Sequence, residues 1–86
     1  MIDPASQELN FVGTMSDAFD GTARLLCDIQ RFGFRLSSLC VLTERQGVEF
    51  AVTVSVPKDS DPGQILSRFS RHVAMLSLRL DGSALQ

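Results

Sequence analysis

Residues 30–41 read QRFGFRLSSLCV and join the end of a predicted helix to the start of a predicted strand. Apolar residues recur at helical spacing up to Phe32, which predicts an amphipathic helix packed on a core. Gly33 follows at the position where helices commonly end in a left-handed conformation. After it, apolar residues at 34 and 36 and then at 39 and 41 predict a strand that changes phase around Ser37 and Ser38, as a β-bulge does.

Working outward from this stretch, the preceding sequence predicts a strand followed by the helix. Residues 9–15 alternate apolar and polar side chains, with Gly13 as a candidate bulge. Asp17 is the predicted N-cap of the helix, and Asp20 lies in its first turn, where a carboxylate is favourable. The predicted core-facing stripe consists of Thr22, Leu25, Leu26, Ile29 and Phe32. The charged residues Asp20, Arg24, Asp28 and Arg31 are expected on the solvated side.

The following sequence predicts two further strands and a second helix. Five apolar residues alternate strictly with less apolar ones over residues 48–56, which predicts a strand with one covered face: Val48, Phe50, Val52, Val54 and Val56. Asp61 and Pro62 predict the start of a helix whose apolar stripe reaches Val73. A short last strand is predicted from the alternation of Leu76, Leu78 and Leu80.

The order of these elements is β-α-β-β-α-β, which predicts an α+β, ferredoxin-like sandwich. Right-handed crossovers place both helices on one face of a four-stranded antiparallel sheet. We expect a flexible leader over residues 1–7, a single domain over residues 8–81 and a tail over residues 82–86. The other face of so small a sheet, or one of its edges, commonly binds a partner.

Composition excludes several classes of function. The chain has 86 residues and a net charge of −2, which argues against binding to nucleic acid or to an anionic membrane. Neither a signal peptide nor a membrane-spanning run is recognisable, so a cytoplasmic protein is expected. Cys27 and Cys40 are expected as small buried hydrophobic residues. The single histidine, His72, cannot complete a zinc site or a catalytic triad with them, so neither a metal, a cofactor nor an enzymatic activity is expected.

The run Gly33-Phe34-x-Leu36-x-Ser38-Leu39-x-Val41 resembles a segment of the small regulatory subunits of acetolactate synthase, which are built on the ACT domain. Gly21 falls where ACT domains carry a glycine at the start of their first helix, and the resemblance extends from about residue 16 to residue 80. It implies a non-catalytic subunit that activates the catalytic chain of acetolactate synthase in branched-chain amino-acid biosynthesis. It also implies a homodimer formed side by side through the second strand and the first helix.

The resemblance further implies a site for a small amino acid at the seam of the dimer. Its ligand-binding positions would be Asp17, Asp20, Gly21, Thr22, Arg35 and Leu36. Family members that sense valine usually carry an asparagine at each of two positions, which are Ala18 and Arg35 here. Because amide side chains can both donate and accept hydrogen bonds, their loss predicts weak or no feedback by valine. A free-standing amino-acid sensor acting as a homodimer is the alternative.

Overall fold

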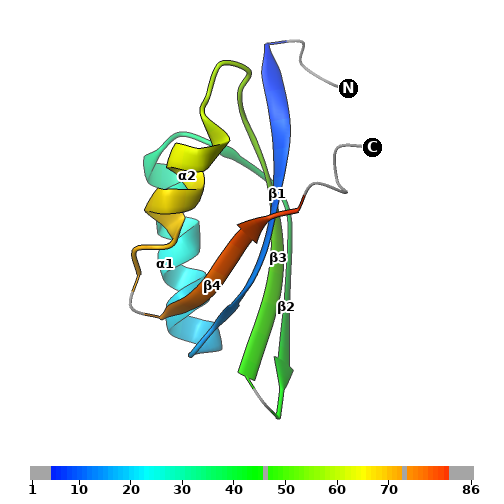
Figure 1. Ribbon diagram of the computed structural model, residues 1–86, viewed down its shortest axis with the longest axis vertical. Helices are drawn as coiled ribbons and strands as arrows, with labels where there is room; N and C mark the ends of the chain where they lie inside the picture. The colour runs from blue at the N-terminus through cyan, green and yellow to red at the C-terminus, as the bar shows by residue number, and fades with distance from the viewer. Residues whose placement is uncertain (1–4, 46, 73, 82–86) are drawn as a thin grey trace.

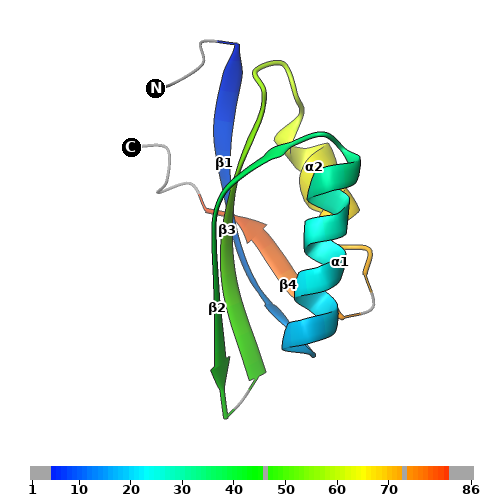
Figure 2. The same ribbon diagram turned by 180° about the vertical axis from the view of Figure 1, so that it is seen from behind.

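The computed structural model describes residues 5–45, 47–72 and 74–81, which form four strands and two helices in the predicted order (Figure 1). The elements are β1 (Ser6–Met15), α1 (Ala18–Arg31), β2 (Arg35–Glu44), β3 (Gly47–Pro57), α2 (Pro62–Phe69) and β4 (Met75–Leu80). The strands form one antiparallel sheet in the order β2-β3-β1-β4. Both helices cover the same face of this sheet, as Figures 1 and 2 show. The ferredoxin-like α+β fold predicted from the sequence is therefore confirmed.

The core lies between the helices and the covered face of the two central strands. All five alternating apolar residues of β3 are buried, as predicted from residues 48–56. Across the β1–β3 pair, Phe11 lies opposite Val52 and Leu9 opposite Val54, so the apolar residues of both strands share a face. The ring of Phe11 meets the ring of Phe69 from α2 edge to face, with centroids 5.6 Å apart.

The predicted ends of the elements are also confirmed. Asp17 caps α1 and Asp61 caps α2, each by accepting hydrogen bonds from backbone N–H groups of the first turn. Gly33 has a φ of +76°, the left-handed conformation expected of a residue that ends a helix. In β2 the register with β3 shifts between Leu36 and Ser38, which leaves Ser37 as the extra residue of a bulge.

The start of β1 differs from the prediction. The strand begins at Ser6, three residues before the predicted start at Leu9, so residues 6 and 7 belong to the sheet and not to the leader. The side-chain Nε2 of Gln7 lies 3.0 Å from the carbonyl oxygen of Lys58 and 3.2 Å from that of Ser60. This amide therefore binds the first residues of β1 to the loop that follows β3.

The irregularity expected at Gly13 occurs instead in β4. Gly13 pairs regularly with both neighbouring strands, and the sheet needs glycine there because β4 approaches closely: a Cβ atom would lie 2.1 Å from the carbonyl oxygen of Ser77. In β4 the register shifts so that Met75, not Leu76, pairs with Met15. Leu76 is consequently 65% exposed, and the prediction that it belongs to the covered face was wrong.

The predictions for the two cysteines and for Asp28 were also wrong. Both cysteines are exposed; the bulge in β2 turns Leu39 and Val41 toward the helices and leaves Cys40 on the open face. Asp28 is buried within α1 instead of solvated. Helix α2 ends at Phe69, and the predicted extension of its apolar stripe to Val73 falls on a residue outside the described ones.

Candidate functional site

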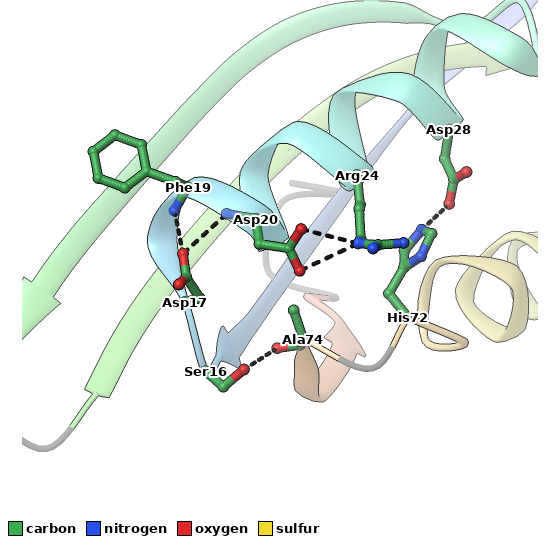
Figure 3. A network of polar contacts seen from close by, with 8 residues as sticks. All are labelled: Ser16, Asp17, Phe19, Asp20, Arg24, Asp28, His72 and Ala74. Atoms are coloured by element: carbon green, nitrogen blue, oxygen red, sulfur yellow. Dashed lines mark hydrogen bonds and ion pairs between the residues drawn. The ribbon is translucent and has the colours of Figure 1, made fainter.

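The N-terminal end of α1 carries four of the six predicted ligand-binding positions, and its backbone donors are already engaged (Figure 3). Oδ1 of Asp17 accepts hydrogen bonds from the N–H groups of Phe19, at 2.8 Å, and Asp20, at 2.9 Å. The N–H of Gly21 donates to the carbonyl oxygen of Asp17 at 2.9 Å. Three of the N–H donors that could attract an anion to this helix N-terminus are thus bound by the chain itself.

The charges at this end of α1 also disfavour a carboxylate ligand. Asp17 and Asp20 place two carboxylates in the first turn, and only Asp20 has a cationic partner there, Arg24, whose Nε lies 3.1 Å from Oδ1. A carboxylate that approached this end would meet like charge and no free pair of N–H donors. The N-terminal end of α1 is therefore better suited to a cationic group from another molecule than to a carboxylate.

Gly21 and Thr22 both contact Met15 of β1. Gly21 is buried where α1 crosses the end of β1, and a Cβ atom there would lie 2.5 Å from the sulfur of Met15. The hydroxyl of Thr22 points to the same sulfur, 3.9 Å away. Both residues therefore hold α1 against the sheet.

Arg35 and Leu36, the remaining predicted positions, lie at the opposite end of α1. The helix has 14 residues, so the two halves of the predicted site are about 20 Å apart within one chain. The guanidinium of Arg35 is exposed and forms no ion pair with any described residue. From Arg35 the strand β2 runs back in the direction of the N-terminal end of α1 and extends past it (Figure 2).

This arrangement means that a second copy could unite the two halves. β2 is an edge strand of the sheet. If two β2 edges paired in antiparallel fashion about a two-fold axis, the start of one β2 would lie beside the end of the other. Arg35 of one copy would then approach the acidic end of α1 of the other copy, where a cation is favoured.

A surface of exposed apolar side chains lies along the same edge, and we call it the α1–β2 flank. It consists of Phe19, which is 90% exposed, together with Leu26 and Leu36. Phe19 and Leu26 are two turns apart, on the side of α1 opposite Asp28, whose carboxylate faces the segment after α2. Leu36 pairs with Val54 and therefore lies on the helix-covered face of the edge strand. The sequence did not predict this surface: Leu26 was expected in the core-facing stripe, which was wrong because it is 37% exposed.

The buried carboxylate of Asp28 has a partner that the sequence did not reveal. It contacts Nε2 of His72, from the segment between α2 and β4, and its side chain is 9% exposed (Figure 3). Ser16 joins the same segment from the other side, because its N–H donates to the carbonyl oxygen of Ala74 at 2.8 Å. These contacts fix the α2–β4 connection to α1, which is a structural role for the only histidine.

A hollow with a volume of about 460 Å³ lies on the open face of the sheet. Its floor includes Val12, Cys40 and Ala51, and its rim carries Glu49 and Arg79. Within residues 5–45, 47–72 and 74–81, no group of three acidic, histidine or cysteine side chains could hold a metal ion. No helix in these ranges is long and apolar enough to cross a membrane.

The sequence of this chain matches no protein-family model and no curated protein.

Proposed function

We propose that this chain is a cytoplasmic, non-catalytic regulatory subunit that activates the catalytic chain of acetolactate synthase and responds weakly or not at all to valine. The proposal rests on the resemblance of Gly33–Val41 to the ACT-domain subunits of that enzyme. The backbone is compatible with the resemblance, because the glycine has the left-handed φ and β2 begins two residues later.

The observation that supports weak valine feedback is the self-capped end of α1. A valine zwitterion needs donors for its carboxylate and acceptors for its ammonium group. Asp17 occupies the N–H groups of Phe19 and Asp20, so this end offers a carboxylate no paired donors. A polar ligand group buried without a partner loses affinity strongly.

The observation that supports a homodimer is the α1–β2 flank beside an unpaired sheet edge. Exposed apolar side chains that gather along one edge are typical of an interaction surface. We propose that two copies pair through β2 and α1, and that the paired form binds the active conformation of the catalytic chain more tightly. Such differential binding shifts the population of the catalytic chain toward activity.

Changing Phe19 to aspartate is expected to convert the dimer into a monomer, because a charge would replace the most exposed apolar side chain of the flank. The change should not unfold the chain, since an acidic residue is favourable in the first turn of a helix. Sedimentation velocity measures the outcome. The matched control is Leu76→Asp, which adds the same charge at a 65% exposed leucine of β4, at the opposite edge of the sheet. A dimeric Phe19→Asp variant, or equal dissociation of both variants, would contradict this interface.

The activating role is tested by adding the purified chain to the acetolactate synthase catalytic chain of the same organism. We expect a several-fold rise in acetolactate formation that millimolar valine leaves unchanged. Phe19→Asp should reduce the stimulation and Leu76→Asp should not. If there is no stimulation but calorimetry detects valine bound to the isolated chain, the free-standing sensor replaces this proposal. If neither occurs, both functions are excluded.

A further inference from the structure

A second hollow, of about 280 Å³, lies between α2 and the turn that joins α1 to β2. It is separate from the α1 N-terminus and from the open face of the sheet. Its apolar lining consists of Phe32, Phe34 and Ile65, and its polar lining of Ser60, Asp61, Gln64 and Arg68. The volume suits one small molecule, since pockets for drug-sized ligands begin at about 300 Å³.

The apolar floor of this hollow is packed against the core. The rings of Phe32 and Phe34 lie 5.6 Å apart at 55°, and Phe32 stacks on Phe69 with centroids 6.0 Å apart. Phe69 is fully buried and is held in turn by Phe11. The two half-buried rings therefore form a preformed surface that a ligand can cover without reordering the core.

One cation lies over this floor. The guanidinium carbon of Arg68 is 5.4 Å from the centroid of the Phe32 ring, a distance at which cation and ring attract each other. Arg68 forms no ion pair with any described residue, so the N–H groups of its planar fork are not engaged by a carboxylate of the chain. Gln64 precedes Arg68 by one helical turn and lines the same hollow.

The acidic residue that lines the hollow, Asp61, is the N-cap of α2. Oδ1 of Asp61 accepts a hydrogen bond from the N–H of Gly63 at 2.9 Å and caps α2. Asp61 and Arg68 are seven residues apart, about 10 Å along the helix, and their side chains form no ion pair. The hollow is thus lined by a cationic group, an anionic group and apolar side chains.

We propose that this hollow binds a small carboxylic acid with an apolar tail. The carboxylate would receive hydrogen bonds from the guanidinium of Arg68 and the side-chain amide of Gln64, and the tail would cover Phe32 and Phe34. Arginine suits a carboxylate because its donors are arranged in a planar fork. The apolar floor selects against inorganic anions. This inference is independent of the proposed regulatory function, because binding is measured on the isolated chain.

The test is a titration of the ¹⁵N-labelled chain with 4-methylpentanoate, followed by NMR. The expected result is a saturable shift of the Arg68 Nε–Hε and Gln64 side-chain amide signals. 4-Methylpentanol, which keeps the tail but lacks the carboxylate, should shift neither. L-Leucine has the same tail and carboxylate and adds an ammonium group. If L-leucine binds more tightly than 4-methylpentanoate, the ammonium group is assigned to Asp61. Equal or weaker binding would assign the site to simple acids.

Arg68→Gln should weaken the binding of 4-methylpentanoate by about tenfold or more, because it removes a charge-assisted hydrogen bond. The control is Arg71→Gln, which removes the same charge three residues further along the chain. The side chain of Arg71 does not line the hollow. Thermal unfolding of both variants verifies that they remain folded. The proposal fails if no saturable shift occurs, if the shifts cluster on the open face, or if both variants weaken binding equally.

Discussion

Truncating Phe11 to alanine is expected to lower the free energy of unfolding by about 3–5 kcal/mol. The ring is completely buried, lies opposite Val52 across the central strand pair and packs edge to face against Phe69. Its removal leaves a cavity between the sheet and α2 that neither neighbour can fill without leaving its own packing position. For a domain of this size, whose total stability is small, the loss approaches the whole free energy of folding.

Urea denaturation measures this loss, and Phe19→Ala provides a matched control. The same side chain is deleted, but Phe19 is 90% exposed, so its removal should change the stability of the single chain by less than about 0.5 kcal/mol. Because a dimer would add the interface to the measurement, both variants are compared at low protein concentration. Similar losses for the two variants would contradict the assignment of Phe11 to the core.

The second large effect is expected from Gly13→Ala, a change of one methyl group. The new Cβ atom would lie 2.1 Å from the carbonyl oxygen of Ser77 and 3.0 Å from its carbonyl carbon. These are backbone atoms of the neighbouring strand, so the clash cannot be relieved by rotating a side chain. β4 must move away from β1, and we expect a loss of about 2–3 kcal/mol, at the upper end for an overpacked site.

Gly63→Ala is the matched control for this substitution. At Gly63 the nearest atom to an added Cβ is Oδ1 of Asp61 at 3.4 Å, an ordinary contact. Alanine is also the better helix former in α2, so this variant should be as stable as the natural chain or slightly more so. If Gly13→Ala and Gly63→Ala have the same melting temperature, the close packing of β4 against Gly13 is contradicted.

Features encoded by adjacent residues were predictable from the sequence. The strand β3 was recognised because five apolar residues alternate without interruption. A period of two residues places all five side chains on one face of a strand. Asp17 and Asp61 were recognised as caps because a capping side chain bonds to N–H groups two or three residues ahead. Gly33 was recognised because the residue ending a helix often needs a positive φ.

Features that depend on distant residues were not predictable. Leu76 and Met75 are equally apolar, and only the pairing of β4 with β1 decides which of them faces the core. Asp28 looked like one more charge on a solvated side because its partner, His72, is 44 residues away. The bulge at Ser37 was foreseen, but its consequence for Cys40 was not.

In the candidate sites, too, features of adjacent residues were predictable and features that depend on distant residues were not. The acidic turn at the start of α1 and the exposed Arg35 were each visible in the sequence, but their separation by the length of the helix was not. Phe19 was missed because a single aromatic residue in a capping turn carries no periodic signal by itself. The hollow over Phe32 was missed because its lining comes from two segments about 30 residues apart, which only the packing of α2 on the end of α1 brings together.

The two edges of the sheet are unequal, and this limits how copies can assemble. β2 offers ten residues, whereas β4 offers six and is interrupted by its bulge at Leu76. If both edges were equally good, the β2 of each copy could pair with the β4 of the next, and such head-to-tail pairing forms an open filament unless the rotation closes it into a ring. In the proposed homodimer, the longer edge β2 pairs with the β2 of the other copy. Growth would then stop at two copies, because the short, irregular β4 is a poor edge for pairing.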